Sequence, residues 1–121
     1  ALRKKGKDLI RAKILVLGIA YKKDINDWRE SPAIRIIELL IGKYNSKVTY
    51  TDPYIPTVKI NGKLWKSSKF TNNLVKNSDC VIIVTDHTLY DYDNIVKNAK
   101  LVVDSRGVTR KLGKKDKVVM L

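Results

Sequence analysis

The chain has 121 residues, enough for one hydrophobic core and too few for two comfortable domains. With 44% hydrophobic and 31% charged residues, and only three prolines and six glycines, its composition excludes the disordered and fibrous classes. Its longest apolar runs are far below the roughly 20 residues that a membrane-spanning helix needs, so we expect no membrane-spanning segment.

The charge balance is strongly basic, with 25 Lys and Arg residues against 12 Asp and Glu residues and a net charge of +13. Such a surface attracts polyanions, so a basic nucleic-acid module is one alternative. The basic residues are, however, spread over the whole chain, and no helix-turn-helix, zinc-ligand spacing or stacked-aromatic motif organises them. We therefore expect a lysine-rich solvated surface and no specific nucleic-acid partner.

The start of the chain carries no recognisable secretory signal, and the single cysteine, Cys80, cannot form an internal disulfide. We therefore expect a cytoplasmic protein in which Cys80 behaves as a buried hydrophobe. The chain begins with Ala1 rather than methionine, which we interpret as a piece of a longer protein. Residues 1–11 are then the tail of a preceding helix or a linker, and residues 12–121 are the folded domain.

The first half of the chain predicts a βαβ unit. Residues 12–18 form a short β-branched and leucine run that ends in glycine, typical of a strand buried on both faces of a parallel sheet. Ser31 and Pro32 then predict the N-cap and first turn of a helix with an apolar face, which we expect to end at Gly42. Residues 47–51 predict the second strand, which an Asp-Pro pair stops.

The second half of the chain alternates further helices and strands. It predicts helices at residues 72–77 and 92–99, and strands at residues 81–84, 101–104 and 117–120. Before them, residues 58–65 predict a hairpin on the rim, because Asn61-Gly62 suits a type I′ turn between alternating apolar residues. The order indicates a doubly wound α/β fold: a mainly parallel, Rossmann-like sheet with helices on both faces.

Ligands of doubly wound sheets bind beyond the carboxyl ends of the strands, so the loops there are the candidate site. The loop after the first strand lacks the G-x-G-x-x-G turn of dinucleotide-binding domains, since it has one glycine, Gly18. Tyr21 and Lys22 stand where a pyrophosphate would need bare backbone, so we do not expect this turn to bind NAD. Lys22 and Arg29 can instead meet anionic oxygens; the alternative is a solvated loop with incidental charges.

The other polar loop residues favour structural roles. Asp52 follows the second strand but precedes a proline, so we expect it to form a turn rather than to bind a ligand. His87 is the only histidine and has no nucleophilic partner at a recognisable spacing, and one histidine with one cysteine predicts no zinc site. Asp91 and Asp93 suit the cap of a helix better than an acid/base pair. We find no catalytic centre in the chain.

Four ordered motifs resemble one known family. Residues 16–33 read VLGIAYKKDINDWRESPA, and YTDPY, VTDH and VDSR follow at residues 50–54, 84–87 and 103–106. Together they resemble the C-terminal, UDP-sugar-binding domain of the UDP-glucose/GDP-mannose dehydrogenase family. The YKKD and RESP runs of the first motif, together with the TDH of the third, are most similar to the branch that acts on UDP-N-acetylglucosamine or UDP-N-acetylmannosamine. A stand-alone nucleotide-binding or regulatory α/β domain, without an oxidoreductase role, is the alternative.

The resemblance implies a part of an enzyme that oxidises the C6 alcohol of a UDP-sugar to a carboxylate in two NAD-dependent steps. In the family, an N-terminal Rossmann domain binds NAD and a cysteine in the preceding region forms the covalent intermediates. That cysteine motif is absent from this chain, so we expect the chain alone to be inactive. The resemblance also suggests that the full-length enzyme is a homodimer or larger.

The family's binding residues map onto four positions of this chain. Tyr21 and Lys22 match an aromatic-lysine pair that contacts the UDP-sugar, and Arg106 matches an arginine that contacts the substrate. Arg29 matches an arginine that reaches NAD. The segment after the last strand departs from the family, since D-S-R-G replaces D-T-R-N or D-G-R, which predicts a looser backbone after Arg106.

Overall fold

The computed structural model describes residues 12–20, 31–112 and 117–120. In chain order the elements are β1 (Lys13–Leu17), α1 (Pro32–Tyr44), β2 (Lys47–Thr51), β3 (Thr57–Ile60), β4 (Lys63–Lys66), α2 (Asn72–Asn77), β5 (Cys80–Ile83), α3 (Tyr92–Asn98), β6 (Val102–Asp104), a 3₁₀ turn (Arg110–Leu112) and β7 (Val118–Met120). None of the helices in these ranges is long and apolar enough to cross a membrane. The predicted segment 1–11 lies outside the described residues.

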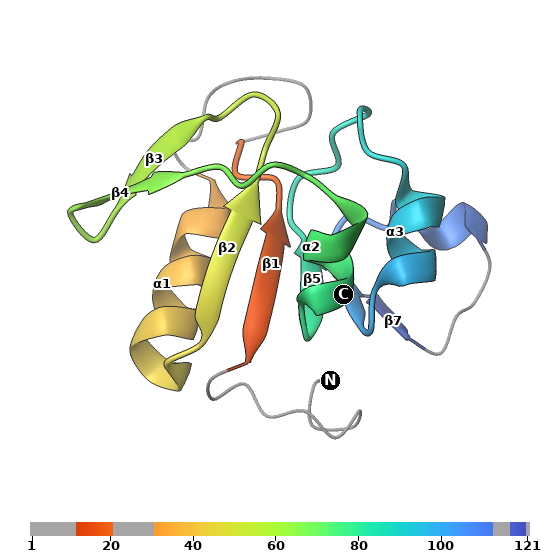
Figure 1. Ribbon diagram of the computed structural model, residues 1–121, viewed down its shortest axis with the longest axis horizontal. Coiled ribbons are helices and arrows are strands. Elements are labelled where there is room, and N and C mark those ends of the chain that lie inside the picture. Colours follow the sequence, from red (N-terminus) through yellow and green to blue (C-terminus); the bar gives the residue numbers. More distant parts are fainter. Residues whose placement is uncertain (1–11, 21–30, 113–116, 121) are drawn as a thin grey trace.

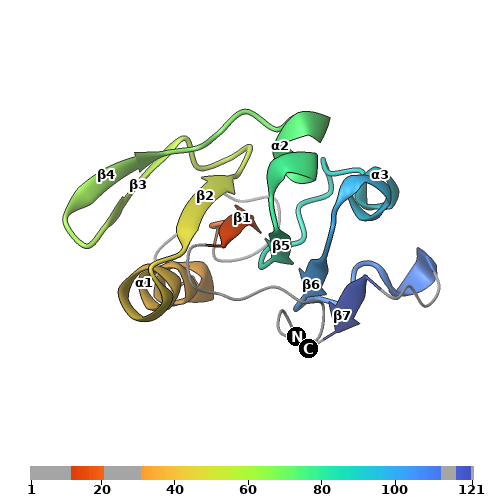
Figure 2. The same cartoon turned by 60° about the horizontal axis from the view of Figure 1, so that its bottom comes forward.

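Five strands form one parallel sheet in the order β2-β1-β5-β6-β7 (Figure 1). The chain leaves β1 in one direction to reach β2 and later returns to the other side of β1 to add β5. Because crossovers between parallel strands are right-handed, the two directions place their helices on opposite faces. Accordingly α1 covers one face, and α2 and α3 cover the other (Figure 2). The predicted doubly wound, Rossmann-like fold is therefore confirmed.

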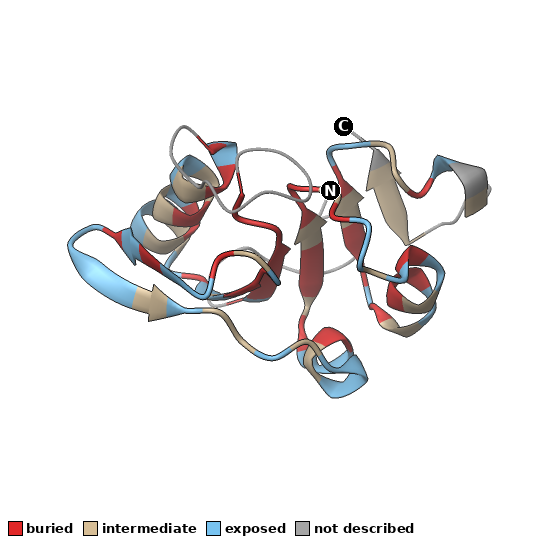
Figure 3. Cartoon of the chain, turned by 90° about the horizontal axis from the view of Figure 1, so that it is seen from above, coloured by how far each residue is buried: buried red, intermediate tan, exposed pale blue. Residues whose placement is uncertain are grey.

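The inner strand β1, which lies between β2 and β5, contributes to both halves of the core. Ile14 and Val16 lie in the apolar cluster on the α1 side, whereas Leu15 and Leu17 lie in the cluster with α2 and α3. Successive side chains of a strand point to opposite faces, so a strand covered on both sides must be apolar throughout. This explains the unbroken hydrophobic run of β1, which lies in the buried centre of the molecule (Figure 3).

Helix α1 begins where the sequence predicts and ends later. The hydroxyl of Ser31 caps it by accepting a hydrogen bond from the amide of Ala33 at 3.2 Å. Gly42, expected at the end, lies inside the helix, so that prediction was wrong. The left-handed cap is Asn45, with a φ of 51° and its amide bonded to the helix. The helix continues two residues past Gly42 to Tyr44, which packs against the α1-side cluster. Asparagine at the cap tolerates the left-handed conformation well.

The hairpin predicted at residues 58–65 is present as β3 and β4. Its turn residues, Asn61 and Gly62, have φ values of 52° and 78°, as a type I′ turn requires. The hairpin projects from the main sheet, and its outer surface is exposed (Figures 1 and 3). Val58 and Ile60 nevertheless point inward and are buried in the α1-side cluster. The hairpin is thus a rim element fixed to the core mainly by β3, with Trp65 of β4 packed against the same cluster.

Candidate functional site

The loops that follow β1, β2, β5 and β6 meet at the carboxyl edge of the sheet, at the top of Figure 1. The loop after β1 approaches the loop after β5 very closely. Gly18 has a φ of 92°, and a Cβ built on it would lie 2.4 Å from the Cβ of Thr85. The amides of Val84 and Thr85 both donate to the carbonyl of Leu17, at 2.9 and 3.2 Å. Glycine is therefore required here by both space and backbone conformation.

A buried carboxylate joins these loops. One oxygen of Asp52, Oδ2, accepts hydrogen bonds from the amides of Ile19 at 2.7 Å and Ala20 at 2.9 Å, and from Nε2 of His87 at 2.8 Å. The other oxygen accepts from the amide of Tyr54 at 2.7 Å. Burial alone would raise the pKa of Asp52, but these hydrogen bonds outweigh it and hold the pKa below its ordinary value. Asp52 is thus the ionised centre of a buried network.

The network explains why this turn differs from a dinucleotide-binding turn. In a Rossmann domain, free backbone amides after the first strand meet the pyrophosphate of the dinucleotide. Here the amides of Ile19 and Ala20 already donate to Asp52, and both residues are fully buried. The described part of the turn therefore does not fit the pyrophosphate of NAD. Asp52 has the structural role predicted for it, at the place where an anion would otherwise bind.

His87 lies at the centre of an aromatic cluster in the loop after β5. Its ring is fully buried and lies 4.8 Å from the ring of Tyr54 and 6.1 Å from that of Tyr90, centroid to centroid. The hydroxyl of Tyr92 donates to the His87 carbonyl at 2.7 Å. Because an ionised carboxylate only accepts hydrogen bonds, Nε2 of His87 donates to Asp52. The structural role expected of this histidine is confirmed, although its partner was not foreseen.

Arg106 lies at the same edge, after β6. Its side chain is exposed, and Nε donates to the carbonyl of Val84 at 2.8 Å, which ties the guanidinium to the loop after β5. The backbone that carries it is fixed by Asp104, which accepts from the amides of Arg106, Gly107 and Thr109 and from the Thr109 hydroxyl. The prediction of a looser backbone after Arg106, made from the D-S-R-G sequence, was therefore wrong.

Burial would raise the pKa of Asp104, but the hydrogen bonds it accepts, led by that of the Thr109 hydroxyl, lower the pKa below its ordinary value. The free nitrogens of an arginine anchored through Nε can still meet an anionic ligand in a fixed direction. The geometry of this loop thus presents a positioned cation at the carboxyl edge.

The other predicted binding residues, Tyr21, Lys22 and Arg29, lie outside the described residues. Ala20, the residue directly before Tyr21, is described. The carbonyl of Ala20 accepts from the hydroxyl of Thr85 at 2.7 Å, and its amide donates to Asp52. Both peptide groups of Ala20 are therefore held, and this residue lies at the same edge as Arg106.

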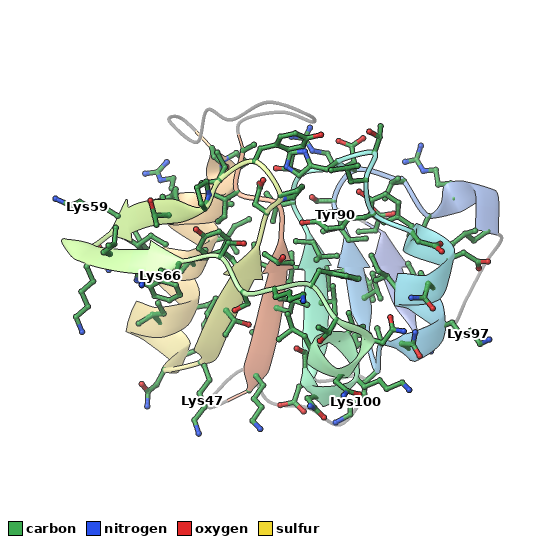
Figure 4. All side chains as sticks on the ribbon, turned by 45° about the horizontal axis from the view of Figure 1, so that its top comes forward. Lys47, Lys59, Lys66, Tyr90, Lys97 and Lys100 are labelled. Atoms are coloured by element: carbon green, nitrogen blue, oxygen red, sulfur yellow. The ribbon has the colours of Figure 1, made fainter. Side chains whose placement is uncertain are left out.

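A cleft of about 390 Å³ opens on the β2 side of this edge. Phe70 and Tyr90, whose ring centroids are 5.5 Å apart, line it together with two prolines, Pro53 and Pro56. Tyr90, labelled in Figure 4, donates its hydroxyl to the carbonyl of Thr51 at 2.9 Å. In the sheet order, β1 and β5 separate β2 from β6. The cleft and Arg106 therefore lie on opposite sides of the point where the chain reverses direction.

Comparison with known proteins assigns the family. A family model described as the UDP-glucose/GDP-mannose dehydrogenase family, UDP binding domain, matches residues 15–111, which include the last three residues of β1 and the loops after β1, β2 and β5. The chain belongs to this family. The predicted resemblance is thus confirmed.

Individual relatives agree with this assignment. UDP-N-acetyl-D-mannosamine dehydrogenase from Methanococcus vannielii is 30% identical over 112 residues, covering 86% of this chain and 25% of the relative. The protein of the same name from Escherichia coli K12 is 29% identical over 103 residues, covering 81% and 24%. This family domain therefore spans about a quarter of the length of the curated relatives it matches.

Solved structures show the same likeness in three dimensions. The UDP-D-ManNAc dehydrogenase from Pyrococcus horikoshii superposes with a TM-score of 0.74 at 25% identity, covering 98% of this chain and 27% of that one. An NDP-N-acetyl-D-galactosaminuronic acid dehydrogenase from Methanosarcina mazei also gives 0.74 at 25% identity, covering 99% and 26%. The UDP-binding domain of this family therefore has homologues in dehydrogenases of nucleotide-linked amino sugars.

Proposed function

We propose that this UDP-binding domain serves an NAD-dependent nucleotide-sugar 6-dehydrogenase whose substrate is a UDP-N-acetylhexosamine, either UDP-N-acetylglucosamine or UDP-N-acetylmannosamine. The parent enzyme would oxidise the C6 alcohol of the sugar to a carboxylate. The names of the relatives make UDP-N-acetylmannosamine the first substrate to test. In this proposal the rest of the parent chain is a partner of the domain, and the whole enzyme is a cytoplasmic dimer or larger assembly.

The observation that carries the proposal is that the loop after β5 contacts both Arg106 and Ala20, the last described residue of the loop after β1. Arg106 is anchored to Val84 in the loop after β5, and Thr85 in the same loop holds Ala20, two residues before Lys22. A UDP-sugar has two phosphates, so a lysine and an arginine from neighbouring loops suit its diphosphate and sugar oxygens. An aromatic side chain at Tyr21 suits an apolar face of the same ligand.

NAD has a separate place in this proposal. The turn after β1 does not fit a pyrophosphate, because Asp52 occupies its amides. We therefore assign most of the NAD contacts to another part of the parent enzyme, with Arg29 as the residue of this domain that reaches the cofactor. When bound, NAD accepts the hydride from the sugar. The domain itself binds and orients the UDP-sugar, and we expect it to be inactive alone.

Calorimetric titration of the 121-residue chain with UDP, the two UDP-N-acetylhexosamines and NAD tests the proposal. If Lys22 and Arg106 each make a charge-assisted hydrogen bond to the ligand, replacing either by alanine weakens UDP-sugar binding roughly ten- to a hundredfold. Lys100→Ala is the matched control, because Lys100 is exposed at the opposite, amino edge of the sheet (Figure 4).

We expect the Lys100 variant to retain the wild-type affinity. Equal weakening by Lys22→Ala and Lys100→Ala would show that the +13 charge alone attracts the ligand, an effect that fades with salt. In the parent enzyme, Arg29→Ala should raise the KM for NAD and leave the KM for the UDP-sugar nearly unchanged. Tight UDP binding by a parent protein without dehydrogenase activity would favour a regulatory domain instead.

A further inference from the structure

We infer that Asp52 and His87 form a positioning pair, which sets the backbone from which Tyr21 and Lys22 reach the UDP-sugar. The inference rests on the proposed function of those two residues. It assigns to the buried pair a role in ligand affinity, beyond its contribution to the stability of the fold. Neither residue touches the ligand in this account; both act through the turn after β1.

The pair holds this turn from the two strands that flank β1. Asp52 follows β2, His87 follows β5, and their contact at 2.8 Å passes over the carboxyl end of β1. The same carboxylate oxygen, Oδ2, accepts the amides of Ile19 and Ala20. One atom therefore ties together three loops that are separated by more than 30 residues of sequence.

Ala20 is the last fixed residue before the proposed binding segment. Its amide donates to Asp52 at 2.9 Å, its carbonyl accepts from Thr85 at 2.7 Å, and its side chain is fully buried. With both peptide groups held, the direction in which the chain leaves toward Tyr21 is set. A shift of about 1 Å in such a start is enough to misplace a binding side chain at its ligand.

The chemistry of the pair explains why both members are needed. A buried carboxylate is costly unless donors surround it, and His87 supplies the side-chain donor among the four. Without His87, the carboxylate loses a hydrogen bond and is drawn toward solvent. With asparagine in place of Asp52, only one side-chain oxygen remains to accept, so at least one of the four donors faces an amide nitrogen instead. Either change frees the turn while leaving the two apolar clusters in place.

The loop after β5 also connects the two proposed ligand contacts. Thr85 and His87 hold the start of the Tyr21-Lys22 segment, and the carbonyl of Val84 holds Nε of Arg106 at 2.8 Å. Displacing this loop would therefore move both cations relative to each other. A diphosphate bound between them would be sensitive to that separation.

The test combines ligand affinity with a measurement that needs no ligand. Asp52→Asn keeps the shape of the side chain and removes its charge, His87→Leu removes the donor, and His87→Gln restores an N–H donor at a similar reach. Affinity for UDP-N-acetylmannosamine and UDP-N-acetylglucosamine is measured by calorimetry on the 121-residue chain. Amide NMR signals of Tyr21 and Lys22, assigned in the free chain, report the position of the segment.

We expect Asp52→Asn and His87→Leu to weaken UDP-sugar binding about tenfold or more and to shift the two amide signals. His87→Gln should stay within about threefold of the wild type. Val96→Ala, which removes core volume under α3, controls for lost stability and should leave both the affinity and the two signals unchanged. If His87→Gln restores the affinity that His87→Leu loses, the N–H donor to Asp52 is what matters for ligand binding, rather than the histidine ring itself.

The inference would be overturned if the wild-type chain binds the UDP-sugar and the Asp52→Asn variant binds it with the same affinity and with unchanged Tyr21 and Lys22 amide signals. A wild-type chain that binds no UDP-sugar would instead refute the proposed function itself. If Asp52→Asn does not fold, His87→Leu decides, because it removes the side-chain donor of the pair. Wild-type affinity and unchanged Tyr21 and Lys22 signals in that variant would equally overturn the inference.

Discussion

Replacing Gly18 with alanine tests the close approach between the loops after β1 and β5. Gly18 has a φ of 92°, and an added Cβ would lie 2.4 Å from the Cβ of Thr85. The positive φ costs an L-residue about 1–2 kcal/mol, and the overlap adds about 1–3 kcal/mol. We expect Gly18→Ala to lower the free energy of unfolding by about 2–5 kcal/mol, a large part of the stability of an ordinary domain.

Two other glycines separate the cost of the positive φ from the cost of the overlap with Thr85. Gly62 has a φ of 78° with nothing within 4 Å of an added Cβ, so Gly62→Ala should cost only the backbone strain of about 1–2 kcal/mol. Gly42 lies inside α1 with free space around it, so Gly42→Ala should stabilise the domain by about 0.5–1 kcal/mol. Urea denaturation followed by circular dichroism measures all three. A Gly18→Ala domain no less stable than Gly62→Ala would contradict the overlap.

Three further predictions concern single side chains. Because the folded pKa of Asp104 is lowered, its stabilisation is present above its unfolded value of about 3.9 and is lost as pH falls through the folded pKa. The destabilisation by Asp104→Asn, measured by urea unfolding, should therefore shrink in acid; a constant difference would contradict this. Burial, with Asp79 nearby, raises the pKa of the Cys80 thiol to about 12, so thiol reagents should label it only after unfolding. Ser31→Ala should cost about 1 kcal/mol in thermal unfolding, through loss of the α1 cap, and no cost would refute that role.

Most of the fold was predictable because its elements have local signals. Residues 47–51 and 72–77 agree with β2 and α2 at both ends, since turn and cap residues bound each apolar segment. The end of α1 was not predictable from the same signals. Gly42 is a favoured helix terminator, but packing of Tyr44 against the core extends the helix to a cap at Asn45. Tertiary contacts outweighed the local preference there.

The site was predictable only in part, and for a topological reason. Arg106 was expected at the carboxyl edge and lies there, because it directly follows a predicted strand. Asp52 and His87 were each expected to be structural, but their contact was missed. They are 35 residues apart, and they meet because β2 and β5 flank β1. The order of strands in the sheet is the information that the sequence patterns lack.

The β3–β4 hairpin has a consequence for behaviour in concentrated solution. In the described part of the chain these two strands pair only with each other, so each leaves an open edge. Open edges can recruit strands of neighbouring molecules, and lysine on them discourages this. Lys59, Lys63 and Lys66 are exposed on the hairpin, and Lys59 points away from the molecule (Figure 4). Two hairpins that met edge to edge would bring these like charges together, so part of the +13 charge keeps the molecules from forming shared sheets.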